Sequence, residues 1–171
     1  LTFMCGIFAC FQKKNQNYKF ENFIQHNKLL YRRGPDNNGE ISFLNNQNSV
    51  FFGHNRLSIQ DISQNGSQPM LSNSGRFCII FNGEIYNHFT LRKLINDNKN
   101  ITWKSNSDTE TLINLFDIYY DNLEFFFNLL EGQFALGIFD KRLNKLTLAR
   151  DKVGEKPLYI NCNKNFIAFS S

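Results

Sequence analysis

The chain has 171 residues, of which 42% are hydrophobic and 20% charged, so a folded globular protein is expected rather than a disordered one. The net charge of +4 includes no run of five basic residues, and no apolar stretch approaches the roughly 18 residues of a membrane span. We therefore expect neither nucleic acid nor a membrane as a partner, and the length predicts one domain over residues 1–171.

The predicted elements mix strands and helices over the first three quarters of the chain. In chain order they are a strand at 5–11, a helix at 21–31, a turn at 33–40, strands at 49–52 and 76–81, and helices at 88–96, 108–119 and 122–131. Pro35 and two glycines predict the turn. The helix at 108–119 is predicted to begin with Ser107 or Asp108 as its N-cap, with Glu110 in its first turn.

After Gly132 the pattern changes to strands alone. They are predicted at 133–140, 145–150, 157–160 and 166–171. Short links between these strands favour hairpins, and a hairpin pairs its two strands antiparallel. An α+β domain is therefore predicted, whereas the order of its layers does not follow from periodicity.

The four cysteines are Cys5, Cys10, Cys78 and Cys162, and they contain no CxxC pair and no zinc-binding spacing with the three histidines. We expect no metal site and reduced thiols, which together with the absence of a recognisable secretory signal predicts a cytoplasmic protein. Cys10, Cys78 and Cys162 lie in apolar runs and are predicted to be small core residues.

Cys5 is the candidate nucleophile, although a cysteine in an apolar strand is by itself more often a core residue. If Met4 is the initiator and is removed, Cys5 becomes N-terminal. A thiol whose free pKa is ~8.5 needs a base to form its thiolate. The α-amine of an N-terminal cysteine, with a pKa of roughly 7.7–8.0, is such a base, directly or through a water. His54 is a second candidate base, but a buried, hydrogen-bonded histidine is the commoner role.

Eight short sequences occur in one order over nearly the whole chain. They are MCGIF at 4–8, RRGPDNNGE at 32–40, GHNRLSIQD at 53–61, QPM at 68–70, NGEIYN at 82–87, SDTE at 107–110, GQFALGIFD at 132–140 and ARDKVGEKPLY at 149–159. Together they resemble the class II glutamine amidotransferase domain, a member of the N-terminal-nucleophile hydrolases. GHNRLSIQD and ARDKVGEKPLY resemble its asparagine-synthetase branch.

This resemblance implies a fold and an activity. The fold is a four-layer αββα sandwich with two antiparallel sheets. The activity is hydrolysis of L-glutamine to glutamate and ammonia through a thioester on Cys5, with the ammonia supplied to an asparagine-synthetase-like amidation. Arg32 stands where this branch usually has histidine, and Asn37 where it often has aspartate, so fine specificity is open.

The resemblance also implies the groups that stabilise the tetrahedral oxyanion. The side-chain amide of Asn82 and the backbone N–H of Gly83 would donate to it. A glycine suits this role because nothing obstructs approach to its amide. Read alone, NGE at 82–84 is more simply interpreted as a turn.

The amino-acid head of the substrate needs one cation and one anion. The resemblance assigns Arg56 to the α-carboxylate, a task that suits a planar guanidinium, and Asp108 to the α-ammonium, assisted by Glu84. The structural alternatives are a surface ion pair for Arg56 and a helix N-cap for Asp108. Backbone groups of three further residues would line the pocket: Leu57, Ser58 and Ile59.

Other matched residues are predicted to be structural. They are a loop at Gly34, Pro35 and Asp36, a turn at Gln68, Pro69 and Met70, and a tightly packed strand pair containing Gly132, Ala135 and Asp140.

No cofactor is expected in this domain. In the family, ATP and Mg²⁺ belong to a C-terminal synthetase domain, and this chain contains neither a GK[ST] phosphate loop nor an SGG-type pyrophosphatase loop. The expected partners are L-glutamine and a synthetase domain or separate synthetase subunit that receives ammonia. The amidated acceptor is open, as is the oligomeric state, with a homodimer as one option.

Three residues at the start of the chain, Leu1 to Phe3, leave a second hypothesis open. If they remain attached, Cys5 has no free amine, and the protein is a blocked module that binds glutamine or docks on a synthetase. A third hypothesis, hydrolysis of another amide, is disfavoured because Arg56 and Asp108 together read both charges of a free amino acid.

Overall fold

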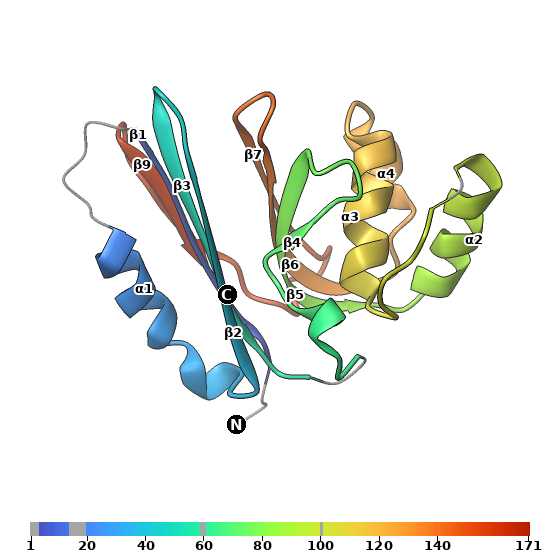
Figure 1. Cartoon of the computed structure of the whole chain (residues 1–171), viewed down its shortest axis with the longest axis horizontal. Coiled ribbons are helices and arrows are strands. Elements are labelled where there is room, and N and C mark those ends of the chain that lie inside the picture. Colours follow the sequence, from blue (N-terminus) through green and yellow to red (C-terminus); the bar gives the residue numbers. More distant parts are fainter. Residues whose placement is uncertain (1–3, 14–19, 59–60, 100) are drawn as a thin grey trace.

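The computed structural model describes residues 4–13, 20–58, 61–99 and 101–171. Its secondary structure forms two sheets that face each other, with helices on their outer faces (Figure 1). Leu1–Phe3 and Ile59, on which two predictions depend, lie outside the described residues.

The first sheet has five strands in the order β2-β3-β1-β9-β8. All of its pairs are antiparallel. Its strands are β1 (Gly6–Lys13), β2 (Asn37–Leu44), β3 (Asn48–Arg56), β8 (Tyr159–Cys162) and β9 (Phe166–Ser170). The central position of β1 places the residue just before it, Cys5, beside the end of β3, because Gly6 pairs with Asn55.

The second sheet has four antiparallel strands in the order β4-β5-β6-β7. These strands are β4 (Met70–Leu71), β5 (Phe77–Ile85), β6 (Gly132–Asp140) and β7 (Lys145–Arg150). Because β4 is only two residues long, it pairs with the first half of β5 and leaves the same edge of the second half open to other partners.

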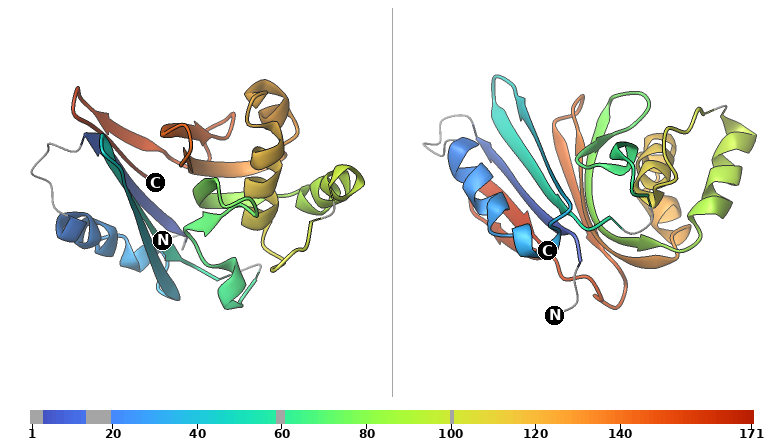
Figure 2. Two further views of the ribbon diagram at one scale, coloured as in Figure 1. Left: turned by 45° about the horizontal axis from the view of Figure 1, so that its top comes forward. Right: turned by 60° about the horizontal axis from the view of Figure 1, so that its bottom comes forward.

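Helices cover the outer face of each sheet. They are α1 (Phe20–Lys28), α2 (His88–Asn98), α3 (Asp108–Tyr119) and α4 (Leu123–Asn128), with short 3₁₀ turns at Tyr31–Arg33 and Gln64–Gly66. Helix α1 lies on the five-stranded sheet, and α2, α3 and α4 lie on the other side of the molecule; Figure 2 shows the same arrangement from two further directions. The predicted α+β fold and four-layer αββα sandwich are confirmed.

Three apolar clusters hold these layers together. One fills the space between the two sheets and includes Ile7, Phe52 and Phe169. A second packs the four-stranded sheet against α2, α3 and α4, and a third packs α1 on the five-stranded sheet. In β1, β3 and β5 alternate side chains point to opposite faces, as a strand between two apolar layers requires.

The chain 33–40 is not a turn throughout, and this prediction was wrong in its second half. Strand β2 begins at Asn37 and continues to Leu44, with half-buried and exposed residues alternating along it. This pattern is typical of an edge strand with one solvated face. The glycine Gly39 lies within the strand, where a Cβ would come 1.9 Å from the carbonyl oxygen of Gln68.

Two of the three predicted core cysteines are buried, and one is not. Cys10 and Cys78 lie in the apolar clusters. Cys162 is exposed because β8 is an edge strand whose four residues are all exposed, so the prediction was wrong there. In the described part of the chain no helix is both long and apolar enough to cross a membrane.

Candidate functional site

Cys5 lies where the ends of β1 and β3 meet. The backbone N–H of Leu57, the first residue after β3, donates to Cys5 Sγ at 3.3 Å, and Sγ lies 3.6 Å from the Leu57 carbonyl oxygen. The thiol is half-buried. Burial raises its pKa, whereas the hydrogen bond from Leu57 and the charge of Arg56 lower it. The thiolate therefore depends on nearby donors and cations.

Arg33 is a second cation near Cys5 that the sequence did not single out. It ends the 3₁₀ turn after α1, and a Cβ added at Gly6 would lie 3.5 Å from Arg33 Cβ. Burial lowers the pKa of Arg33, and the charge of Cys5 acts in the opposite direction. Its Nη2 atom is buried and has no hydrogen-bond partner among the described residues. Its position in RRGPDNNGE, at the start of the turn predicted at 33–40, was the available signal.

A cavity of about 80 Å³ lies beside Leu57. This volume equals roughly two to three water molecules, which suits a small charged head group. Five predicted site residues line it: Arg56, Leu57, Gly83, Glu84 and Asp108. Six further lining residues were not predicted as parts of the site: Asp61, Gly66, Gln68, Phe81, Ser107 and Thr109.

The loop that follows β3 holds the Arg56 guanidinium in place. Nη1 donates to the Ser63 carbonyl at 2.8 Å, and Nη2 donates to the Asp61 carbonyl. Gly66 makes this possible, because a Cβ there would lie 2.4 Å from Nη2. Arg56 is 7% exposed and pairs with no carboxylate in the described chain, so the alternative of a surface ion pair is wrong.

Asp108 is the first residue of α3, and Ser107 is the N-cap, accepting a hydrogen bond from the Thr109 N–H at 3.1 Å. The carboxylate of Asp108 is instead turned to β5 and accepts from the Ile85 N–H at 2.9 Å. Burial raises its pKa to about 6; the bonds from Ile85 and Thr109 lower it, and the charge of Glu84 raises it further. A buried carboxylate of this kind gains from a bound cation.

Gly83 presents its N–H to the cavity side of β5. The N–H of Phe81 donates to Gln68 Oε1 at 2.6 Å, and the N–H of Ile85 donates to Asp108. Residues two apart in a strand direct their N–H groups to the same edge, so the N–H of Gly83 lies between these two. A Cβ at Gly83 would lie 2.2 Å from the carbonyl oxygen of Gln133. The close approach of β6 therefore requires glycine at this position.

Asn82 points to the other face of β5, between the sheets. Its Nδ2 donates to Ser171 Oγ at 3.1 Å, and that hydroxyl also accepts from the Ile7 N–H at 3.4 Å. Asn82 is buried but does not line the cavity. Ser171 thereby links β5 to β1, a contact that sequence reasoning missed.

Of the remaining predicted residues, Glu84 lies at the rim of the cavity, and Ser58 and His54 do not line it. The Ser58 N–H donates to Asp36 Oδ2 at 2.7 Å, which ties the loop before β2 to the end of β3; Ser58 does not line the cavity. Glu84 is exposed at the rim. His54 is fully buried, and burial lowers its pKa to about 3, which makes it a poor proton acceptor at neutral pH.

Met4, which precedes the thiol, also has a partner. The ammonium of Lys156 lies 2.8 Å from Met4 Sδ. The turn that carries Lys156 is fixed by Asp151, which accepts the N–H groups of Glu155 and Lys156 at 2.9 and 3.0 Å. Among the described residues no group of three or more His, Cys, Asp or Glu side chains could hold a metal ion.

Comparison with known proteins gives one family for nearly the whole chain. Residues 4–171 match the family described as "Glutamine amidotransferase domain". The chain is 35% identical over 170 residues to a probable glutamine-hydrolysing asparagine synthetase of Dictyostelium discoideum and 37% identical over 171 residues to glutamine-hydrolysing asparagine synthetase 1 of Bacillus subtilis. These matches cover 98% of the chain but 29% and 26% of the relatives, so the chain spans less than a third of their length.

A solved structure with a similar fold is the glutamine phosphoribosylpyrophosphate amidotransferase from B. subtilis complexed with ADP and GMP. The TM-score is 0.76 at 18% sequence identity, and the match covers 97% of this chain and 41% of that one. At this identity the likeness concerns the fold alone. It agrees with the two antiparallel sheets and their helical layers.

Proposed function

The chain belongs to the glutamine amidotransferase domain family, and from this premise we propose that it hydrolyses L-glutamine to glutamate and ammonia with Cys5 as nucleophile. The observation that carries the proposal is one cavity lined by both Arg56 and Asp108, next to the residue that hydrogen-bonds the thiol. A cation and an anion in one cavity, with the thiol hydrogen-bonded by a third lining residue, Leu57, match a free amino acid whose side-chain amide reaches Cys5.

The α-amine of Cys5 acts as the base when Cys5 is the first residue. It takes the thiol proton while Sγ bonds to the amide carbon, and the carbonyl oxygen becomes an oxyanion. The N–H of Gly83 donates to this oxyanion, and Asn82 joins it only by turning its Nδ2 away from Ser171 Oγ, to which it donates in the structure. The α-ammonium then returns the proton to the leaving nitrogen, and the C–N bond breaks. Ammonia is released, and a γ-glutamyl thioester remains on Cys5.

Water completes the cycle. The α-amine takes a proton from a water molecule whose oxygen attacks the thioester carbon, and the C–S bond breaks as glutamate forms. The proton returns to Sγ. Arg33 and Arg56 favour the thiolate in both halves of the reaction by their positive charge. No cofactor takes part in this scheme.

The ammonia is delivered, in this proposal, to an asparagine-synthetase-type amidation. The support is the identity of 35% and 37% to two proteins named as glutamine-hydrolysing asparagine synthetases. The acceptor, ATP and Mg²⁺ would bind a synthetase domain or subunit outside residues 1–171, and these residues would form a single domain. Four free cysteines suit the reducing cytoplasm as its location.

A second candidate function follows from the contact between Lys156 and Met4. With Met4 in place, the nitrogen of Cys5 is an amide and cannot act as a base. The protein would then bind glutamine, or dock on a synthetase, without turnover. The intact mass separates these two functions, because the hydrolase requires a chain that begins at Cys5.

The test of the proposed function is glutamate release from glutamine by protein expressed from Met4, compared with its Cys5→Ala variant. We expect release by the unsubstituted protein and loss of at least about a thousandfold in the variant, since the covalent route is removed. Equal rates for the two proteins would refute the assignment of the nucleophile.

A further inference from the structure

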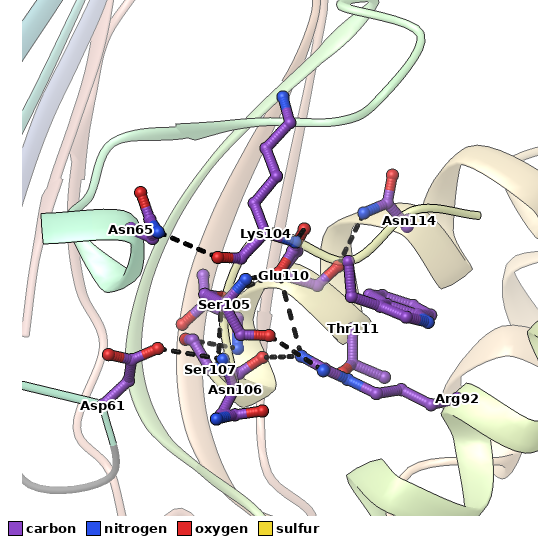
Figure 3. A network of polar contacts seen from close by, with 12 residues as sticks. Asp61, Asn65, Arg92, Lys104, Ser105, Asn106, Ser107, Glu110, Thr111 and Asn114 are labelled. Atoms are coloured by element: carbon purple, nitrogen blue, oxygen red, sulfur yellow. Dashed lines mark hydrogen bonds and ion pairs between the residues drawn. The ribbon is translucent and has the colours of Figure 1, made fainter. Parts of the chain in front are cut away.

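Asp61 connects the chain around Arg56 with the segment that leads to Asp108. Its carbonyl oxygen accepts from Arg56, while its Oδ1 accepts from the Ser63 N–H at 2.8 Å and so closes the turn that also holds Arg56. Its Oδ2 accepts from the Asn106 N–H at 2.9 Å. Asn106 lies two residues before Asp108. One side chain thus joins the loop around the guanidinium to the segment that leads to the carboxylate (Figure 3).

The far end of this link is rigidly held. Arg92 of α2 donates to the carbonyl groups of Ser105 and Ser107 at 2.9 and 2.8 Å. Glu110 of α3 accepts from the N–H groups of Lys104 and Ser105 at 2.9 and 2.8 Å. Segment 104–107 is therefore fixed to two helices (Figure 3), and Asp61 fastens the loop after β3 to a fixed point.

A second, weaker contact runs beside the first. Asn65 Nδ2 donates to the Lys104 carbonyl at 2.9 Å. It joins the same loop to the same segment, but as a neutral hydrogen bond, which contributes roughly half as much as a charge-assisted one.

We propose that Asp61 is a positioning residue that sets the separation between the Arg56 guanidinium and the Asp108 carboxylate, and so makes the site select ligands with both α-charges. This inference rests on the proposed function. A fixed separation favours binding of a ligand with both charges through two contacts, because neither the Arg56 guanidinium nor the Asp108 carboxylate then has to be ordered on binding. A ligand with one charge gains at one point only.

The alternative is that the Asp61 carboxylate only closes its own turn. The substitution Asp61→Asn distinguishes the two roles. Asparagine keeps one acceptor oxygen, which suits the turn at Ser63, but replaces the second oxygen with an NH₂ group that cannot accept from Asn106. The variant should therefore keep the turn and lose the link. Asp97→Asn on the exposed end of α2 is the matched control, with the same change of charge and atoms.

The readout compares glutamine with 4-carbamoylbutanoate, which is glutamine without the α-ammonium. For protein expressed from Met4, Asp61→Asn should raise KM for glutamine about tenfold at nearly constant kcat, as expected for loss of a charge-assisted contact. The ratio of kcat/KM for glutamine over the analogue should fall several-fold. Asn65→Ala should shift both values in the same direction by less, and Asp97→Asn should shift neither.

An unchanged ratio in Asp61→Asn, with the protein folded, would overturn the inference, because loss of a purely structural contact would affect both ligands alike. If Asp61→Asn does not fold, Asn65→Ala decides, and an unchanged ratio there has the same meaning. If the unsubstituted protein hydrolyses neither ligand, the proposed function fails instead. The two failures are thus distinguishable.

Discussion

At the scale of single residues, the site contains two acidic groups, Cys5 and Asp108, whose burial disfavours their charged forms. Burial raises the pKa of the Cys5 thiol and also raises that of Asp108, to about 6. Partners favour each charged form: Leu57 and the neighbouring arginines act on the thiolate. For Asp108 the backbone N–H groups of Ile85 and Thr109 do so, and a bound ammonium would add to them. The α-ammonium of an amino acid would therefore offset the free-energy cost of burying the charged form of Asp108.

The pKa of Asp108 predicts a stability cost that depends on pH. Because the folded pKa is about 6 and the ordinary pKa of an aspartate is 3.8, the folded state binds more protons than the unfolded state between these values. The free energy of unfolding therefore falls as pH rises from about 4 to about 6, and the cost is fully present above. Asp108→Asn should remove up to about 3 kcal/mol of this cost at pH 7.5 and none below pH 4.

Urea denaturation at pH 4 and pH 7.5 checks this prediction, with Asp121→Asn, an exposed aspartate just beyond α3, as control. Asp108→Asn should also weaken glutamine binding at least about tenfold, because a neutral amide forms no ion pair with the α-ammonium. Equal stability differences at both pH values would show that Asp108 is ionised without cost in the folded protein.

At the scale of elements, the site depends on how α2 and α3 hold the segment between them. Arg92 is 8% exposed, lies 3.8 Å from Glu110, and stacks over the Trp103 ring at 4.3 Å from the ring centre. It also donates to Thr111 Oγ1 at 2.7 Å. A buried arginine with this number of partners costs more to remove than an exposed one, because the partners stay buried and unpaired.

Arg92→Met should therefore lower the free energy of unfolding by about 3 kcal/mol. It should also raise KM for glutamine, because Arg92 holds segment 104–107, which directly precedes Asp108 and fixes its position. Lys93→Met, at the exposed neighbouring position, should leave both values nearly unchanged. Chemical denaturation and glutamate-release kinetics measure the two effects. A loss below about 0.5 kcal/mol would mean that the other contacts hold this segment without Arg92.

Most elements could be predicted from the sequence because their patterns are local. The helix at 108–119 has the predicted bounds, and the strands predicted at 133–140 and 145–150 agree within one residue. Strand β2 was missed because Pro35, Gly34 and Gly39 indicate a turn, and only its pairing with β3 makes a strand of residues 37–44. Strand β4 has two residues and carries no pattern of its own.

At the scale of the whole molecule, the site forms where segments far apart in the sequence converge. Register places Cys5 beside the end of β3, and α3 brings Asp108 to the open edge of β5. The resemblance of the motifs identified these residues, but it did not predict how they are arranged in space. Arg33, Asp61 and Ser171 were missed because their roles come from tertiary contacts: burial near the thiol, a link to segment 104–107, and a bond between the sheets.

The four cysteines differ in their surroundings, so their reactivities can be compared within one protein to test whether Cys5 is the nucleophile. Cys10 and Cys78 are buried, and burial raises the pKa of each to about 12, so neither should react at neutral pH. Cys162 is exposed and should react with any electrophile, whatever its shape. Cys5 alone lies beside a cavity lined by Arg56 and Asp108, so only its reaction should depend on recognition of an amino acid.

The most direct test is alkylation by a glutamine analogue that carries a chloromethyl ketone in place of the amide, followed by peptide mass spectrometry. In protein whose chain begins at Cys5, the thiolate should displace chloride and label Cys5 stoichiometrically, and glutamate should prevent this. Labelling of Cys162 should be slower and unaffected by glutamate. Labelling confined to Cys162, or labelling of Cys5 that glutamate does not slow, would contradict a glutamine site at Cys5.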